Sequence, residues 1–194
     1  MNKNLIITQS IKNNIELGKK VLNNENILIT IEKITKEVIN AFKHDKKAFF
    51  CGNGGSAADA QHLAAELSGK FYLDREPLFA EALHVNSSYL TAVANDYSYD
   101  EVYARLIKGK GREGDILIAI STSGNSQNII KAIKIANDIK MITVGLTGKD
   151  GGMMNDMCKY LIKVPSSDTP RIQELHILIG HIICEIVEKK LFYD

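Results

Sequence analysis

The sequence contains no tryptophan, only three prolines and only three cysteines among its 194 residues. The cysteines, Cys51, Cys158 and Cys184, are odd in number and form no CxxC pair, and two of them lie in apolar runs that suit a small buried thiol. We therefore expect a reducing compartment. A large charge of either sign is also missing, since 24 Lys and Arg residues face 23 Asp and Glu residues. This balance gives no general field for nucleic acid or an anionic membrane, so an anionic ligand must be bound locally.

Long apolar segments are absent as well. No stretch reaches the roughly 20 apolar residues of a membrane-spanning helix, and polar residues such as Lys3 and Lys12 interrupt the short apolar runs near the start, unlike a signal peptide. The length suits one domain with a core large enough to fold without disulfides or a structural metal. We expect a single domain over residues 1–194, in the cytoplasm.

The first 45 residues are poor in helix breakers. They hold no proline and one glycine, Gly18, and their apolar residues recur at helical spacing. The pattern predicts two amphipathic helices separated near residues 23–26. We interpret this pair as an N-terminal helical extension of the domain.

After residue 45 the sequence alternates between short apolar runs, glycine-rich turns and helical patterns. Strands are predicted at residues 47–51, 115–120, 141–146 and 160–164, and helices over about 57–69, 127–139 and 170–191. Pro170 suits the start of the last helix, with Asp168 or Thr169 as its cap. Nearly all-apolar strands in such an order indicate an α/β fold with a mostly parallel sheet covered on both faces. Sheets of this kind bind ligands at the carboxyl ends of their strands.

A serine-rich loop follows the second predicted strand and opens a helix, as Ser121-Thr122-Ser123-Gly124-Asn125-Ser126. At such a position, free backbone N–H groups and the helix dipole favour an anion, and the hydroxyls add further donors. We interpret the loop as a phosphate cradle; the alternative is an ordinary serine-rich loop. It contains no lysine and is therefore not the nucleotide P-loop.

A glycine-rich loop, Gly52-Asn53-Gly54-Gly55-Ser56-Ala57, follows the first predicted strand. It fits the dinucleotide pattern G-x-G-x-x-A, but the run before Asp74 is too short for a convincing second strand, so a nicotinamide enzyme is a minor alternative. We instead expect the glycines to let backbone N–H groups approach a polyhydroxylated substrate. Asn53 and Ser56 would then hydrogen-bond to that substrate.

Two helices carry further candidate groups. His62 and Glu66 lie four residues apart and share a helix face, where they can bind a metal or supply a base, unless they merely form a solvated face. On the last helix, a hydrogen-bonded core histidine is the default interpretation for both His176 and His181. Gln173 and His181 are about 12 Å apart along that helix and roughly 80° apart around it. If both serve one site, the helix start is distorted or the two side chains come from different subunits.

Five segments occur in the order and at the spacing of one family: CGNGGSAADAQHLAAEL, AVANDYSYDEVY, GREGDILIAISTSGNS, LTGKDGG and RIQELHILIGHIICEIVE. Over nearly its whole length, the sequence resembles the bacterial phosphoheptose isomerases, which are SIS-domain proteins. The resemblance implies an SIS-type three-layer fold and a homotetramer with interfacial active sites. It also implies conversion of sedoheptulose 7-phosphate to D-glycero-D-manno-heptose 7-phosphate through an enediol. That reaction is the first step toward an ADP-heptose precursor for lipopolysaccharide or capsule.

The same resemblance implies roles for individual residues. Glu66 and His181 would be the catalytic proton-transfer pair, and one zinc ion per subunit would be bound by His62, Glu66, Gln173 and His181. With the two loop residues argued above, the expected substrate contacts are Asn53, Gly54, Gly55, Ser56, Glu66, Asn95, Asp96, Ser121, Thr122, Ser123, Ser126 and Gln173. Lys70 stands where some relatives have arginine, and Pro170 stands where some have an acid. Neither departure touches the proton-transfer pair.

Two other protein classes remain as alternatives. SIS proteins that bind the bacterial replication initiator resemble the family, but they tend to lack equivalents of Glu66 and His181, both of which are present here. A phosphosugar-sensing regulator would need a DNA-binding or catalytic partner domain, and the first 45 residues carry no concentrated basic helix. We therefore expect an enzyme that acts on a sugar phosphate, with neither nucleic acid nor a membrane as its partner.

Overall fold

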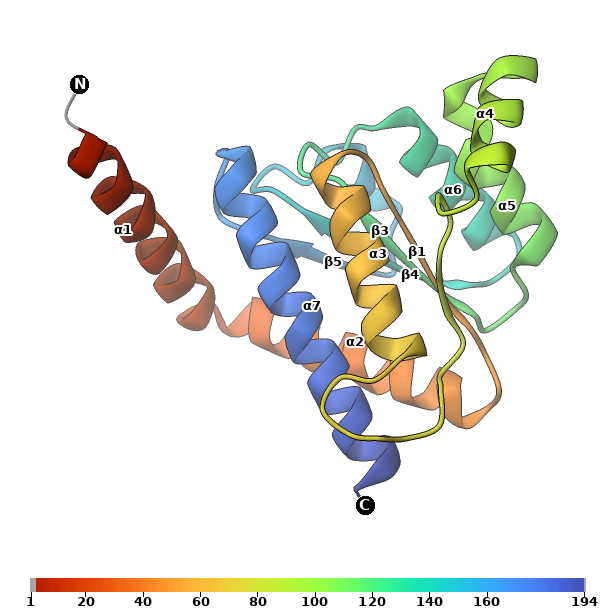
Figure 1. The fold of residues 1–194 in the computed structure, drawn as a ribbon, viewed down its shortest axis with the longest axis horizontal. Helices are drawn as coiled ribbons and strands as arrows, with labels where there is room; N and C mark the ends of the chain where they lie inside the picture. Colours follow the sequence, from red (N-terminus) through yellow and green to blue (C-terminus); the bar gives the residue numbers. More distant parts are fainter. Residues whose placement is uncertain (1–2, 194) are drawn as a thin grey trace.

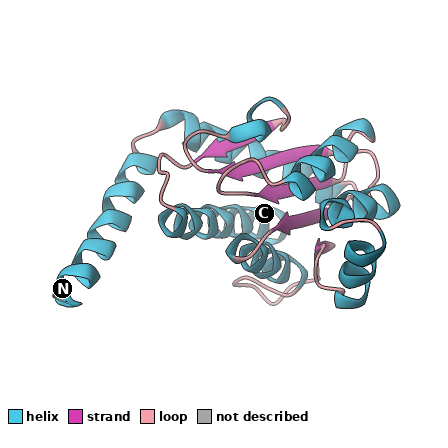
Figure 2. Ribbon diagram, turned by 90° about the horizontal axis from the view of Figure 1, so that it is seen from above, coloured by secondary structure: helices cyan, strands magenta, loops and turns pink. Residues whose placement is uncertain are grey.

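The computed structural model describes residues 3–193, and its core is a five-stranded sheet between two layers of helices (Figures 1 and 2). The strands are β1 (Ala48–Gly52), β2 (Ala80–Ala82), β3 (Ile116–Ile120), β4 (Ile142–Thr147) and β5 (Tyr160–Lys163). The helices are α1 (Lys3–Leu22), α2 (Glu25–Lys43), α3 (Gly55–Ser68), α4 (Ser87–Asp96), α5 (Val102–Lys110), α6 (Gln127–Asp138) and α7 (Thr169–Phe192), with 3-10 turns η1 (Tyr99–Glu101) and η2 (Gly152–Asp156). No helix within these residues is both long and apolar enough to cross a membrane.

The sheet has the order β2-β1-β3-β4-β5, and every neighbouring pair is parallel, which confirms the predicted α/β architecture. The register pairs Gly52 with Ile120 and Ile120 with Leu146. The carboxyl ends of β1, β3 and β4 are therefore level. The glycine-rich and serine-rich loops leave the sheet along the same edge, where the sequence predicts a ligand site.

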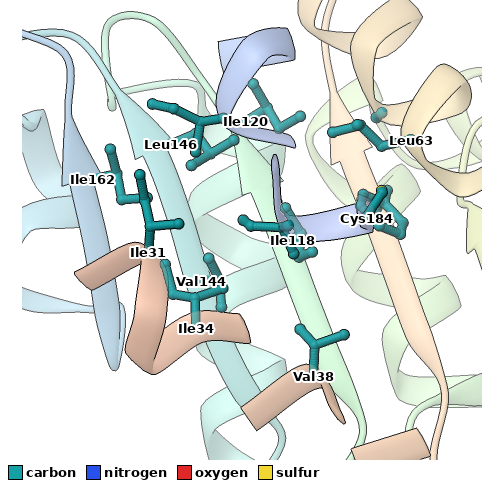
Figure 3. Packing of buried hydrophobic residues seen from close by; sticks show 14 of the residues in the cluster. Ile31, Ile34, Val38, Leu63, Ile118, Ile120, Val144, Leu146, Ile162 and Cys184 are labelled. Carbon is teal, nitrogen blue, oxygen red and sulfur yellow. The ribbon is translucent and has the colours of Figure 1, made fainter. Parts of the chain in front are cut away.

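The two faces of the sheet are covered by different helices. Alternate strand residues point to opposite faces, so Phe50 packs with α2, α3 and α7, whereas Phe49 packs with α5 and α6. Figure 3 shows Ile34 and Val38 of α2 beside Ile118 and Val144 of the central strands. β1 and β3 are buried on both faces and carry no polar side chains, which explains their continuous apolar runs.

The predicted N-terminal pair of helices is present, with its break at residues 23–24. Asn24 caps α2, because its Oδ1 accepts a hydrogen bond from the backbone N–H of Ile27 at 3.2 Å. Whereas α2 lies against the core, α1 projects away from it (Figures 1 and 2). Near the start of α7, Asn14 Nδ2 donates to Glu174 Oε2 at 2.7 Å and Arg171 donates to the backbone carbonyl of Ser10 at 3.1 Å.

Three elements between residues 70 and 114 have no counterpart among the predicted ones: β2, α4 and α5. β2 is only three residues long and depends on pairing with β1, which sequence periodicity cannot detect. At the start of α7, Asp168 takes the cap position without a side-chain hydrogen bond, and the helix begins at Thr169. The predicted bounds of the other elements agree with the observed ones to within two residues.

Candidate active site

The serine-rich loop connects β3 to α6. Ser121 Oγ lies 3.1 Å from Ser126 Oγ, and Ser123 Oγ accepts the backbone N–H of Asn125 at 3.2 Å. Ser126 is the N-cap of α6, but its side chain makes no capping hydrogen bond, so the first turn keeps donors for a ligand. Clustered hydroxyls at a helix N-terminus suit a phosphate.

Gly124 is required by the shape of this loop. Its φ is +66°, and a Cβ at this position would lie 2.6 Å from the carbonyl carbon of Gly151. Only glycine permits both the left-handed backbone and this approach of the loop after β4.

The serine-rich loop and the loop after β4 thus form one rim. A pocket of about 190 Å³ opens beside this rim, lined by Thr122, Ser123, Gly148, Lys149, Asp150, Ser166, Ser167, Thr169 and Ile172. A larger open hollow, of about 850 Å³, lies at the junction of α1 and α2 and touches neither ligand loop.

Asn53, at the end of β1, joins the glycine-rich loop to α6. Its Nδ2 donates to Asn128 Oδ1 at 2.9 Å, and Asn128 Nδ2 donates back to Asn53 Oδ1 at 2.8 Å. The Tyr99 hydroxyl donates to the same Asn53 oxygen at 3.3 Å. Because Asn53 Oδ1 already accepts two hydrogen bonds, the group left for a ligand is the second N–H of its amide.

A compact polar cluster lies where α3 meets α7, two helices that run side by side (Figure 1). His62 Nε2 is 3.0 Å from Glu66 Oε1, and His181 Nε2 is 3.4 Å from His62 Nε2. The ligand atoms of the three residues all lie within 4.8 Å of one another. The predicted i, i+4 pair on α3 is therefore confirmed as a shared face, and His181 completes it.

The surroundings of His181 favour its neutral imidazole. Burial and the neighbouring His62 lower the pKa of His181, while Glu66 acts in the opposite direction. A neutral His181 can accept a proton or donate a lone pair to a metal. Two imidazole nitrogens and one carboxylate oxygen at this spacing match the three protein ligands of a catalytic zinc site. The cluster therefore fits the expected metal through the chemistry of its donors.

Gln173 lies elsewhere on α7. A Cβ on Gly55 would lie 2.5 Å from Gln173 Nε2, so this side chain covers the start of α3 rather than the histidine cluster. α7 is regular from Thr169 onward, so the helix start is not distorted. Within one chain, Gln173 and His181 are therefore not brought together as ligands of one ion.

The remaining predicted contacts differ in how the structure presents them. Gly54 and Gly55 are exposed at the start of α3, in reach of a ligand at the strand ends. Ser56 is 4% exposed and faces the core, which makes it a poor direct contact in this subunit. Asn95 and Asp96 are exposed at the end of α4, where Asn95 Nδ2 donates to Asp96 Oδ1 at 3.0 Å.

His176 behaves as the core histidine that the sequence predicts. It is fully buried, and its Nε2 donates to the backbone carbonyl of Thr147, at the end of β4, at 3.1 Å. Burial lowers the pKa of His176 to about 4. It thus has a structural role next to the site, whereas His181 faces His62 and Glu66.

Known proteins of similar sequence place the chain in a family. The SIS domain family matches residues 12–148, and a phosphoheptose isomerase of Clostridium acetobutylicum is 53% identical over 190 residues, covering 98% of this chain and 96% of that protein. The chain belongs to the phosphoheptose isomerase family of SIS-domain proteins. Phosphoheptose isomerase 2 of Campylobacter jejuni is 49% identical over 191 residues, covering 98% of this chain and 95% of its own.

Solved structures of the same family have the same fold. The phosphoheptose isomerase of Neisseria gonorrhoeae superposes with a TM-score of 0.90 at 38% identity, over 96% of this chain and 98% of that one. The phosphoheptose isomerase of Francisella tularensis gives a TM-score of 0.93 at 33% identity, over 97% of this chain and 100% of that one. The SIS-type three-layer architecture expected from the sequence is confirmed.

Sequence reasoning missed several polar residues that the family fold brings to the site. Asp59 lies one turn before His62 on α3, its Oδ2 is buried without a hydrogen-bond partner among residues 3–193, and burial raises its pKa. Asn128 holds Asn53 from 75 residues away. The spacing of Asp59 and His62 was visible in the sequence, but the pairing of Asn128 depends on the tertiary fold.

Proposed function

We propose that the chain is an aldose–ketose isomerase that converts sedoheptulose 7-phosphate to D-glycero-D-manno-heptose 7-phosphate. The observation that carries the proposal is the convergence of Glu66, His62 and His181 on one face between α3 and α7. A serine-rich cradle for the phosphate lies at the carboxyl end of the same sheet. The sequence relatives supply the substrate class, since they are named phosphoheptose isomerases.

The phosphate contributes binding energy far from the reacting carbons. Ser121, Ser123 and Ser126 would hold it together with the first backbone N–H groups of α6, and Asn53 would donate to a substrate oxygen through its remaining N–H. Binding at the distant end orients C1 and C2 without covalent chemistry there.

Proton transfer is assigned to Glu66 and His181. Glu66 removes a proton from C1 of the ketose, which leaves an enediolate with its charge on the C2 oxygen. Neutral His181 takes the proton of the C1 hydroxyl and passes it to the C2 oxygen, and Glu66 returns its proton to C2, so that the enediol intermediate becomes the aldose. Every proton taken up in the first half is returned or replaced in the second, so both side chains end as they began.

Zinc is the proposed metal, held by His62, Glu66 and His181 of one subunit and by Gln173 of a neighbour. When bound, it would supply Lewis-acid stabilisation of negative charge on the substrate oxygens. The donor set supports this proposal, because its three donor atoms lie within 4.8 Å of one another.

A homotetramer is the proposed assembly. Two features support an oligomer: Gln173 lies apart from the histidine cluster within one chain, and α1 exposes the apolar side chains of Ile7, Ile11 and Ile15. Such an assembly would place the active sites between subunits. A cytoplasmic location and a role in an ADP-heptose pathway for lipopolysaccharide or capsule stay predictions.

The deciding experiment is a direct assay of sedoheptulose 7-phosphate conversion by the purified protein. Glu66→Gln should lower turnover by at least about 100-fold, because it removes the base, while phosphate binding and folding are kept. Glu113→Gln, at an exposed glutamate outside the site, is the matched control and should retain activity. Chelation should lower turnover and added zinc should restore it.

Two results would contradict the proposal. One is near-normal turnover by Glu66→Gln. The other is absence of conversion by the zinc-loaded wild-type oligomer, and tight binding of that oligomer to a replication initiator would then favour the non-catalytic alternative.

A further inference from the structure

A buried ion pair joins the two helices that carry the histidine cluster. Arg75 Nε lies 3.0 Å from Glu188 Oε2, and the two side chains are only 2% and 1% exposed. Arg75 belongs to the segment 69–79 between α3 and β2, which we call the strap. Glu188 lies on α7, seven residues after His181 and therefore on nearly the same face of that helix.

Glu188 holds the strap through its backbone. Its carboxylate accepts the N–H groups of Phe71 at 3.0 Å, Tyr72 at 2.7 Å and Leu73 at 3.0 Å, in addition to Arg75. Burial raises the pKa of Glu188, but these hydrogen bonds outweigh burial, and the pKa lies below its ordinary value. One buried carboxylate thus fixes three consecutive residues of an irregular segment.

Arg75 holds the end of α3 in a complementary way. Its guanidinium donates to the backbone carbonyls of Glu66 at 2.9 Å and Leu67 at 2.9 Å, and of Gly69 at 3.1 Å just past the helix end. The last carbonyls of a helix lack partners within the helix, and a cation there also matches the helix dipole. The carbonyl of Glu66, the proposed base, is among the groups held in this way.

The strap also forms part of the wall of the cluster. The Phe71 ring centroid lies 5.7 Å from that of His181, and the Phe71 backbone N–H is one of the three that Glu188 fixes. The ion pair is therefore linked to α3 through Arg75, belongs to α7 through Glu188, and holds Phe71, the residue beside His181.

Stability alone is a poor explanation for this pair. Burying two charges carries a desolvation cost, and well-packed apolar residues often replace such a pair without loss of stability. Each of the other Lys or Arg ion pairs described within residues 3–193 has at least one solvent-exposed side chain. Arg75 and Glu188 instead combine an ion pair with seven hydrogen bonds from or to the backbone, all directed at the strap and the end of α3.

We propose that Arg75 and Glu188 are positioning residues for the metal and proton-transfer cluster, because they set the spacing of α3 and α7 and hold Phe71 beside His181. The inference rests on the proposed function, but it concerns residues that contact neither substrate nor metal. Its test therefore needs a readout other than turnover.

The test compares zinc affinity and kinetics in three variants. Glu188→Gln keeps the size of the side chain but leaves Arg75 without its counter-charge. Arg75→Met/Glu188→Leu removes both charges and keeps an apolar volume, so that a folded variant is available if the single one unfolds. Glu185→Gln, an exposed glutamate on the same helix that pairs with Lys189, is the matched control.

Zinc affinity of the metal-free protein is measured by competition with a chromophoric chelator, and folding is checked by near-UV circular dichroism. In folded Glu188→Gln and in the double variant, we expect zinc to bind at least about tenfold more weakly and kcat to fall by about tenfold, the usual size of such supporting effects. KM for the sugar phosphate should stay within about twofold, because the phosphate loop follows the carboxyl end of β3, whereas the strap leads into the start of β2. Glu185→Gln should match the wild type in every measurement.

A folded double variant with wild-type zinc affinity and kcat would overturn the proposal, since the pair would then serve stability alone. An equal loss in Glu185→Gln would overturn it as well. Wild-type protein without isomerase activity would count against the proposed function only, and the zinc affinities of the variants would still decide the positioning role.

Discussion

His176 and His181 are five residues apart on α7, yet their surroundings give them different chemistry. His181 faces Glu66 and His62, whereas His176 is sealed in the core against Thr147. The sequence predicted a core histidine as the default for both, because an apolar helix carries no local sign of which face meets another helix. The separation arises only when α3 packs on α7.

The buried His176 makes stability depend on pH. Its pKa is lowered from 6.5 to about 4 in the folded chain, so its contribution is complete above pH 6.5 and is lost as the pH falls toward 4. This change in pKa corresponds to a contribution of about 3 kcal/mol to the free energy of unfolding. Urea unfolding at pH 7, 5.5 and 4 measures how the free energy of unfolding falls with pH. It should fall less in His176→Gln than in the wild type, and the difference should be about the contribution of His176. Parallel pH profiles for the two proteins would contradict the assignment.

The reciprocal pair of Asn53 and Asn128 should matter more for substrate than for folding. Asn128→Asp places a carboxylate oxygen against Asn53 Oδ1 and removes the donor that orients it. We expect KM for the sugar phosphate to rise by about tenfold and stability to fall by about 1 kcal/mol. The control is Gln127→Glu, which adds the same charge at the preceding, exposed position of α6. If Gln127→Glu raises KM as much as Asn128→Asp does, the added charge rather than the orientation of Asn53 is responsible for the weaker binding.

At the scale of elements, α3 and α7 approach each other closely at Gly180. A Cβ there would lie 2.5 Å from Leu63 Cδ2, and Leu63 is 2% exposed, so alanine would have to push the helices apart. Overpacking costs about 1–3 kcal/mol, against about 1 kcal/mol gained from the better helix propensity of alanine. Gly180→Ala should therefore lower stability by roughly 1 kcal/mol and should also reduce turnover, as measured by thermal unfolding and the isomerase assay.

Gly18→Ala is the control for this contact, because Gly18 lies within α1 with no atom within 4 Å of the added Cβ. That variant should gain up to about 1 kcal/mol. Equal stabilisation by both alanines would show that the helix contact tolerates the extra methyl group.

The elements with a strong pattern were predictable, and the others were not. β1, β3 and β4 show as apolar runs because they are largely buried, and α3 and α6 follow ligand loops with recognisable glycines and serines. β2 and the helices between residues 87 and 110 lack such signals, since their placement depends on β1 and on α6. The same limit applies to Arg75 and Glu188, which are 113 residues apart in the sequence.

At the scale of the whole molecule, α1 carries the clearest sign of assembly. Ile7, Ile11 and Ile15 recur every four residues and are 59%, 57% and 50% exposed. Ile11→Lys with Ile15→Lys should shift the proposed tetramer toward smaller species, because two charges would enter the apolar stripe. Light scattering coupled to size-exclusion chromatography measures the mass. Asn13→Lys adds charge on the same helix at an already polar position and should leave the assembly unchanged.

If the active sites lie between subunits, turnover per chain should fall together with the tetramer. Full activity in a monomeric double variant would separate the two proposals, since one chain would then contain a complete site. A tetramer that persists in the variant would indicate that another surface holds the subunits together.

Because α2 packs against α7, part of the hydrophobic core stays uncovered while the chain is being synthesised. α2 is synthesised early, but its buried side chains pack with those of α7, which is the last described element to be synthesised. Until those final residues leave the exit tunnel, the apolar faces of α2 and α3 lack their cover. This side of the sheet is therefore the one that a nascent-chain chaperone would need to protect.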